Sequence, residues 1–223
     1  MFKNELATDK AEQTRRAIFE AALALFREKG FDATTMQEVA VRAGVAKGAA
    51  YYYFPGKEAI IQAYYEAVQR SHEQMCGAAF VTDKSLKSRL KVAMHSKFDL
   101  VREDRKLLGV VFRYTGEPEN PLSCLGKGTA EIRERSVRVF EDAVAVEPLP
   151  KDLMRLLPLA LWALQMGLLV MFLYDGSKEQ QRTRKLADGA LDLTLKLLVL
   201  VKLPILRPVR SKLLALLTEA ELL

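Results

Sequence analysis

Apolar residues recur at helical spacing along almost the whole chain. Between residues 9 and 29 they fall at i, i+3, i+4, i+7 and i+8, which is the pattern of one buried helix face. The apolar positions of this stretch are Ile18, Ala21, Ala22, Leu25 and Phe26. Asp9 and Glu12 have the spacing of a capping box, and Gly30 is placed to end the helix. Because no segment shows the period-two alternation of a strand, the sequence predicts an all-α fold.

Residues 35–54 contain two short helical patterns separated by a glycine. Thr35 and Glu38 have the spacing of a capping box, and apolar residues follow at helical spacing. Gly44 can adopt a positive φ without steric cost, so we expect it to end the first piece after about two turns. The second piece begins near residue 46 and ends before a Pro-Gly pair. Two short helices around a tight turn are typical of a helix-turn-helix, whose second helix enters the DNA major groove.

Many residues in and around this segment also match a known family in order and at fixed spacing. They are Phe31, Asp32, Ala33, Thr34, Thr35, Val39, Ala40, Ala43, Gly44, Val45, Lys47, Gly48, Ala49, Ala50, Tyr51, Tyr52, Tyr53, Phe54, Lys57 and Glu58. From about residue 14 to residue 64 the chain resembles the N-terminal domain of TetR-type transcriptional regulators. The resemblance implies an N-terminal three-helix DNA-binding domain and a C-terminal helical domain for ligand binding and dimerisation. Beyond this segment the likeness is architectural only.

The chain departs from the family pattern at four positions. The family usually has Ser where Ala46 stands, a hydroxyl residue at Ala49, a larger aliphatic residue at Ala50 and often His at Tyr53. Ala46 removes a helix N-cap worth about 1 kcal/mol. Ala49 removes a hydroxyl that could contact phosphate. The resemblance therefore implies the docking mode but not the operator sequence.

The predicted recognition helix is short and aromatic. Lys47 can reach guanine O6 and N7 or a phosphate, and Ala49 can touch a thymine methyl group. Tyr51 and Tyr52 can bond a phosphate or a base edge, although half-buried packing is an alternative for both and an equal alternative for Tyr53. The predicted DNA-binding residues are Thr35, Gln37, Lys47, Gly48, Ala49, Tyr51, Tyr52, Tyr53 and Lys57.

The rest of the chain also reads as helices. We expect a DNA-binding domain over residues 9–56, a connector helix over residues 57–76 that ends at Gly77, and an effector-binding and dimerisation domain over residues 77–223. Further helices are predicted over residues 83–104, 105–115, 125–146, 152–174, 178–203 and 209–222. The pattern assigns no role to the last of these helices.

Residues 156–174 form a run of nineteen residues without a formal charge. Such a run is a candidate transmembrane helix. A helix that is apolar all round is equally what a protein needs when one face lies in the core and another meets a partner. Pro158 near its start and Gln165 near its middle favour the buried helix.

A recognition helix this short reads few base pairs. Specific binding therefore requires two half-sites and a homodimer that holds its recognition helices about 34–36 Å apart. The apolar helices over residues 156–174 and 187–203 are the predicted interface. Gly167 and Gly189 would permit close approach of these helices.

Aromatic residues and methionines in the C-terminal region are candidates for an effector pocket. Such pockets are apolar with a few polar anchors, and Met adapts to irregular ligands. The candidate ligand-binding residues are Met94, His95, Phe98, Phe112, Tyr114, Trp162, Met166 and Phe172. They predict a small hydrophobic or amphipathic effector. The alternative is that each residue simply belongs to the core.

Composition narrows the class of protein. Of the 223 residues, 50% are hydrophobic and 28% charged, which indicates a globular chain. The net charge of +6 supports DNA binding only weakly, because residues 178–223 carry more of the excess than residues 1–57. Cys76 and Cys124 show no metal spacing, and no targeting peptide is visible, so reduced thiols and a cytoplasmic location are expected.

Catalytic signals are absent from the sequence. His72 and His95 are the two histidines, and the polar context of His72 predicts an exposed side chain. No phosphate loop, nucleophile elbow or metal motif appears, so no enzyme activity, cofactor or metal is predicted. The sequence predicts a ligand-responsive transcriptional regulator, most simply a repressor. The alternatives are a ligand-independent master regulator and a membrane-associated helical protein.

Overall fold

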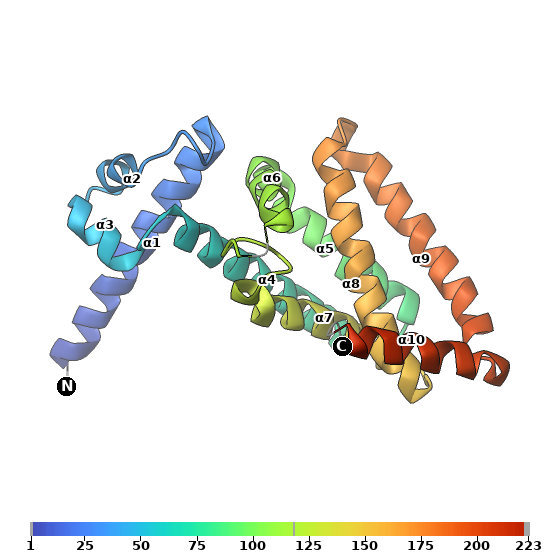
Figure 1. The fold of residues 1–223 in the computed structure, drawn as a ribbon. Coiled ribbons are helices and arrows are strands. Elements are labelled where there is room, and N and C mark those ends of the chain that lie inside the picture. Colours follow the sequence, from blue (N-terminus) through green and yellow to red (C-terminus); the bar gives the residue numbers. More distant parts are fainter. Residues whose placement is uncertain (1, 118, 221–223) are drawn as a thin grey trace. The chain divides into compact units, whose positions relative to one another are not determined.

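The structure is a computed structural model that describes residues 2–117 and 119–220, with the side chains of residues 2–9, 106 and 111 left out. Every regular element in the described residues is a helix, as predicted (Figure 1). The α-helices are α1 (Phe2–Lys29), α2 (Met36–Arg42), α3 (Lys47–Tyr53), α4 (Lys57–Thr82), α5 (Leu86–Val101), α6 (Arg105–Arg113), α7 (Ala130–Val144), α8 (Lys151–Tyr174), α9 (Gln181–Val201) and α10 (Arg207–Glu219). Short 3-10 turns are η1 (Arg102–Asp104), η2 (Tyr114–Gly116), η3 (Lys127–Thr129), η4 (Lys178–Gln180) and η5 (Pro204–Leu206).

Three of the predicted helix ends are wrong by five residues or more. Helix α7 begins at Ala130 instead of residue 125, after the 3-10 turn η3. Helix α1 begins at Phe2, so Asp9 lies within the helix and does not cap it; its side chain is outside the described residues. Helix α4 continues through Gly77 to Thr82. One glycine in a helix costs only about 1 kcal/mol relative to Ala, and burial of Cys76 and Phe80 on either side offsets this cost.

The described chain forms two compact units. The first unit comprises Met1–Ala67 and Glu103–Ala130, and the second comprises Val68–Arg102 and Glu131–Leu223. Helix α4 therefore begins in the first unit and ends in the second. The functional division predicted at residue 77 remains a prediction.

The first unit packs α1 against α2 and α3 (Figure 1). All five apolar positions predicted for α1 are buried. Gly30 and Gly44 follow α1 and α2 with φ of 91° and 68°, so both end a helix in the left-handed conformation that the sequence predicted. Helix α6 also packs on α1, where Asp104 accepts hydrogen bonds from Arg27 Nε at 2.5 Å and from the Tyr64 hydroxyl at 3.1 Å.

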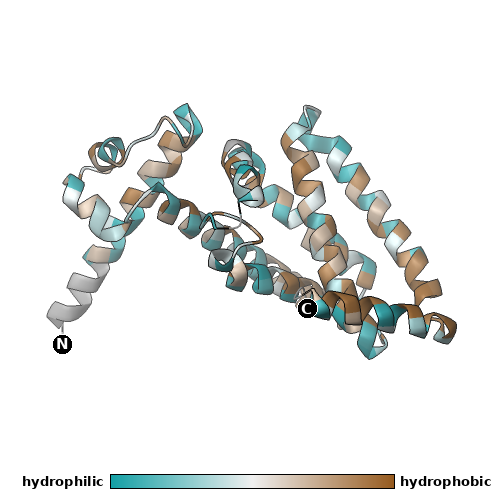
Figure 2. Cartoon of the chain, in the orientation of Figure 1, coloured by the Kyte–Doolittle hydropathy of each residue, from teal (hydrophilic) through white to brown (hydrophobic). Residues whose placement is uncertain are grey.

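The second unit is a bundle in which α8 packs against α5, α9 and α10. The rings of Phe98 and Phe172 stack in its core at a centroid distance of 5.2 Å. Helix α8 contains the uncharged run, continues through Pro158, and is apolar along most of its length (Figure 2). It is the one described helix long and apolar enough to cross a membrane, and 44% of its most apolar window is buried. One face of α8 thus lies in the bundle while the other is exposed.

Candidate nucleic-acid interface and apolar groove

Local hydrogen bonds fix the start of α2. The Glu38 N–H donates to Thr35 Oγ1 at 3.3 Å, and Thr35 N–H donates to Glu38 Oε2 at 2.8 Å, so the predicted capping box is present. The Lys29 ammonium also bonds Glu38, and together these donors lower the pKa of the Glu38 carboxyl to about 2. The start of α2, the helix before the recognition helix, is therefore held by both local and α1 contacts.

Two buried residues anchor α3 and leave its remaining face in solvent. Ala50 and Phe54 are 0% and 2% exposed, and the Arg15 guanidinium lies 4.9 Å from the centre of the Phe54 ring. On the outer face, Tyr51 and Tyr52 are 45% and 83% exposed. One side of α3 therefore packs on α1, and the opposite side is exposed.

The other residues of α3, and those that precede it, are also divided into exposed and half-buried positions. Lys47 and Gly48 are exposed, Ala49 and Tyr53 are half-buried, and the Lys47 ammonium lies 6.0 Å from the centre of the Tyr51 ring. Ala46 occupies the N-cap in extended conformation and makes no side-chain cap bond. At the start of α2, the Gln37 side chain is exposed and the Thr35 hydroxyl is engaged in the capping box.

Lys57 has a different environment from the other predicted DNA-binding residues. Its ammonium donates to the carbonyl oxygens of Phe31 at 2.8 Å and Asp32 at 3.3 Å, and it lies 4.6 Å from the centre of the Phe31 ring. The side chain therefore joins the loop after α1 to the start of α4. A phosphate contact at this position would use the backbone N–H groups of the first turn of α4.

The predicted effector residues are divided between the two units. Phe112 and Tyr114 belong to the first unit, and the other six belong to the second. In the second unit Met94, Phe98 and Phe172 are fully buried, and Met166 is half-buried. The half-buried His95 bonds Asp188 Oδ1 through Nε2 at 3.1 Å.

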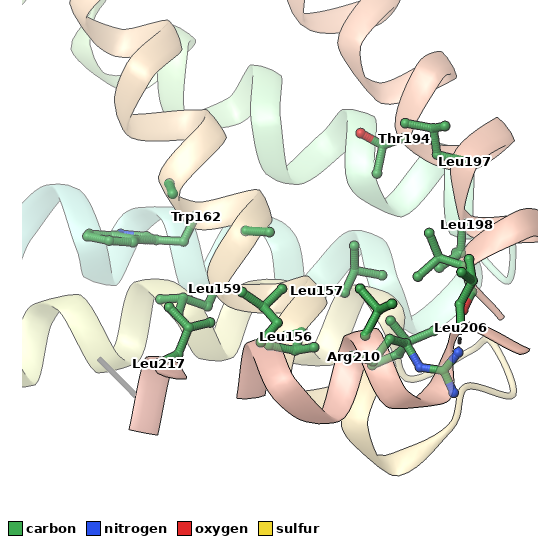
Figure 3. Close-up of a pocket in the computed structure, with 16 residues that line it drawn as sticks. Leu156, Leu157, Leu159, Trp162, Thr194, Leu197, Leu198, Leu206, Arg210 and Leu217 are labelled. Carbon is green, nitrogen blue, oxygen red and sulfur yellow. Dashed lines mark hydrogen bonds between the residues drawn. The ribbon is translucent and has the colours of Figure 1, made fainter. Parts of the chain in front are cut away.

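Trp162 lines a groove between α8, α9 and α10 whose cavity volume is about 630 Å³ (Figure 3). The groove is lined mainly by leucines, with Trp162 and Leu217 at one end and Leu206 and Arg210 at the other (Figure 3). Arg210 is committed to the protein, because it donates to Asp152 Oδ2 at 2.6 Å and to the carbonyl oxygens of Val201 and Leu203. No role could be predicted for α10 from its pattern, and the structure shows that Arg210 bonds the end of α9.

A buried polar cluster in the second unit escaped the sequence analysis. The prediction that His72 is exposed was wrong, because its side chain is 0% exposed. Gln69 and Cys76 lie three residues before and four residues after His72 on the same face of α4, and both are buried as well. That i, i+3, i+7 series is visible in the sequence, but the polar neighbours of His72 predicted an exposed side chain.

Family comparisons agree with this architecture. The model for bacterial regulatory proteins of the tetR family matches residues 18–64, and the model for the tetracyclin repressor-like C-terminal domain matches residues 89–211, which is more than half of the chain. The chain belongs to the tetR family. It is therefore a DNA-binding transcriptional regulator of the helix-turn-helix type.

Individual tetR-family relatives extend the match over most of the chain. The transcriptional regulator SrpR of Pseudomonas putida is 28% identical over 177 residues, which cover 77% of this chain and 80% of SrpR. AcrR of Shigella flexneri is 26% identical over 153 residues, covering 65% of this chain and 71% of AcrR. Both relatives are described as transcriptional regulators.

Solved structures of the family show the same fold. FadR of Bacillus halodurans aligns with a TM-score of 0.65 at 17% identity, covering 80% of this chain and 94% of that protein. FadR of Bacillus subtilis, solved in complex with stearoyl-CoA, aligns with a TM-score of 0.62 at 19% identity, covering 79% and 97%. At these identities the likeness concerns the fold alone.

Proposed function

We propose that this tetR-family regulator is a cytoplasmic repressor that binds a pseudo-palindromic operator as a homodimer and is released by a small hydrophobic or amphipathic effector. The observation that carries the DNA-binding part is the two-sided character of α3. Ala50 and Phe54 anchor the helix, so the exposed Lys47, Tyr51 and Tyr52 are free to enter the major groove. The DNA-binding function is assigned to residues 9–56 and the effector and dimer functions to residues 77–223.

A continuous exposed surface on α8 and α9 supports the homodimer. We call this surface the dimer stripe: Ala160, Ala163, Gly167, Met171 and Tyr174 on α8, and Leu186, Gly189, Leu193, Leu197 and Leu200 on α9. The two halves of the stripe meet, because Met171 and Leu186 line one small hollow and Ala163 and Leu197 line the large groove. Exposed apolar surface of this extent is typical of an interface with another protein.

Small residues let a second copy approach the dimer stripe closely. A β-carbon added at Gly167 or Gly189 would meet no atom of the same chain within 4 Å, so the space above both glycines is open. Packing of α8 and α9 against their symmetry mates would form a four-helix arrangement about a two-fold axis. Since Ala160, Ala163 and Leu197 also border the groove, the same partner would cover its open side.

The effector part of the proposal draws on the relatives and on the second unit. FadR of Bacillus subtilis binds stearoyl-CoA, an amphipathic acyl compound. In this chain α4 runs from the first unit into the second, so a ligand that shifts the second part of α4 would act on the helix that follows the recognition helix. Ligand binding would then weaken operator binding, and operator binding would weaken ligand binding by the same factor.

The decisive experiment selects bound duplexes from a random DNA pool. We expect a pseudo-palindrome whose half-sites lie one helical turn apart, about 10 base pairs centre to centre or a multiple of this. Competition with a panel of hydrophobic and amphipathic small molecules should then release the selected duplex. An asymmetric single site would contradict the dimer, and DNA binding that no compound alters would favour a ligand-independent regulator.

A further inference from the structure

Polar side chains from four helices converge in the core of the second unit. They are Gln69, His72, Glu73 and Cys76 of α4, Ser96 and Lys97 of α5, Arg135 and Ser136 of α7, and Gln165 of α8. Most are buried, and none belongs to the predicted DNA-binding or effector residues. Convergent polar groups with perturbed pKa values inside an apolar domain make this cluster a candidate ligand site.

Gln69 is the centre of this cluster. Its Oε1 accepts hydrogen bonds from Lys97 Nζ at 2.9 Å and from the Ser136 hydroxyl at 2.6 Å, and its Nε2 donates to Glu73 Oε1 at 3.1 Å. Arg135 donates to both oxygens of Glu73, at 2.8 and 2.7 Å. The Glu73 carboxylate is therefore paired with Arg135, and the cluster retains the positive charge of Lys97.

Lys97 is buried without a counter-ion. Its side chain is 8% exposed, and among the described residues its ammonium has one hydrogen-bond acceptor, Gln69 Oε1, and no carboxylate within ion-pair distance. Burial lowers the pKa of Lys97 to about 8, so the ammonium form still predominates at neutral pH. A buried charge that lacks a partner is costly, and proteins retain such groups mainly where they serve a function.

His72 provides a second unsatisfied group in the same cluster. Its Nε2–H donates to the carbonyl oxygen of Ala93 at 2.8 Å, and Gln165 Nε2 donates to the same oxygen at 3.0 Å. Burial, together with the nearby charge of Lys97, lowers the pKa of His72 to about 3, so the imidazole is neutral. Its Nδ1 is then a buried acceptor, and it has no donor among the described residues.

We propose that this cluster binds the anionic group of the effector, a carboxylate or a phosphate ester, with Lys97 Nζ as its counter-ion and His72 Nδ1 as acceptor for a neighbouring hydroxyl or N–H. The inference rests on the proposed ligand response and narrows the effector from hydrophobic or amphipathic to an amphipathic anion. Water could complete the hydrogen bonds of Lys97, but it would leave the charge uncompensated. A neutral ligand would also leave the charge of Lys97 uncompensated.

The position of the cluster explains how such an anion would act on the regulator. Gln69 and His72 lie on α4, and hydrogen bonds tie them to α5 and α7. An anion that binds the other two N–H groups of the Lys97 ammonium would draw it away from Gln69 Oε1. Binding would therefore loosen the Lys97–Gln69 bond that holds α4 to α5, on the helix that continues into the DNA-binding unit.

The test compares four probes of one chain length in the full-length protein, below their micelle-forming concentrations. Octanoate and octyl phosphate carry the anion, octanol is neutral and octylamine is cationic. We expect both anions to raise Tm by about 4 °C at ten times their Kd and to release a selected operator duplex, while octanol and octylamine do neither. Equal shifts with octanol, or no shift with either anion, would overturn the proposal.

Variants of Lys97 separate a binding role from a structural one. Lys97→Met removes an uncompensated buried charge together with the Lys97–Gln69 hydrogen bond, so we expect an unchanged or higher Tm without ligand, weaker but measurable operator binding, and loss of the response to both anions. Lys97→Gln serves as a second neutral variant if the methionine packs poorly, and Lys84→Met, at an exposed lysine of the same unit, should keep the wild-type response. An anion response that survives in both Lys97 variants overturns the site.

One further outcome distinguishes this inference from the function on which it rests. Release of the operator by octanol, equally in the wild type and in Lys97→Met, would uphold the ligand-responsive repressor and refute the anion site. A regulator whose DNA binding no compound affects would contradict the ligand response itself.

Discussion

The two units of this chain make their helices in different ways. In the first unit, α2 and α3 are seven residues each, and their ends are set by neighbours in sequence: the Thr35–Glu38 capping box and Gly44. In the second unit, α8 and α9 have 24 and 21 residues. Asp175 and Ser177 accept hydrogen bonds from first-turn N–H groups of α9, and Arg210 of α10 bonds the carbonyl oxygens of Val201 and Leu203 at its other end. Neighbours in sequence thus set both ends of α2, whereas a residue of another helix holds the end of α9.

The difference extends to the residues for which we propose a function. In the first unit they are exposed polar and aromatic side chains on a helix held from behind, such as Lys47 and Tyr51. In the second unit the distribution is reversed, because apolar residues such as Leu193 are exposed while Lys97 and His72 are buried. The residues with a proposed function thus depart most from the usual burial preference in the second unit, where the proposal requires a partner or a ligand to complete their surroundings.

The largest effect is expected at the dimer stripe. Leu193→Glu places a charge on a residue that is 57% exposed, so the monomer should fold normally while dimerisation fails. Light scattering should give about 25.1 kDa instead of twice that mass, and operator affinity should fall at least about 1,000-fold because each monomer reads one half-site. Val81→Glu, at a 72% exposed residue of α4, is the control, and a dimeric Leu193→Glu variant would refute the proposed interface.

Removal of the cap on α9 should lower stability strongly. The side chains of Arg210 and Asp152 are 7% and 16% exposed, so Arg210→Ala leaves a largely buried carboxylate and two carbonyl groups without their donor. We expect a loss of about 3 kcal/mol and a fall in Tm of about 10 °C. Arg16→Ala, which breaks an exposed pair with Glu20, should leave Tm unchanged. Equal Tm values for the two variants would show that α10 contributes nothing to the bundle.

In the first unit, substitutions on the exposed face of α3 should weaken operator binding without lowering stability. Lys47→Ala and Tyr51→Ala should each weaken operator binding about 10- to 100-fold with little change in Tm, because both side chains are exposed. If Lys47 contacts a phosphate, its loss should also reduce the salt dependence of binding by about one unit in the log–log slope. Tyr51→Phe separates the hydroxyl from the ring. Parallel losses of stability and binding would indicate that these residues serve packing.

The smallest expected effect is a gain in stability at the start of α3. Ala46 has the extended conformation of an N-cap but no side-chain acceptor, so Ala46→Ser should stabilise α3 by about 1 kcal/mol and raise Tm by about 3 °C. Ala46→Gly tests whether the hydroxyl is responsible, because it supplies no acceptor. A serine variant no more stable than the glycine variant would show that local capping does not limit this helix.

The helix-turn-helix could be predicted in detail because the patterns that define it lie close together in the sequence. The capping box, the two left-handed glycines and the buried stripe of α1 were all confirmed, since each depends on residues within about one or two turns of each other. The same reasoning failed at Gly77, where packing of α4 outweighs the cost of one glycine. It also failed at Asp9, because a plausible cap can lie inside a longer helix.

The sequence by itself determined the family, the all-helical fold and the helix-turn-helix, because helical periodicity and capping are encoded by residues close together in the chain. Only the tertiary structure decided that His72 and Lys97 are buried together, that α10 closes one side of a groove, and that the exposed faces of α8 and α9 meet. These properties depend on contacts such as Lys97 with Gln69 and Ser136 with Gln69, which join separate helices. A polar side chain carries no local sign of whether water or another helix will surround it.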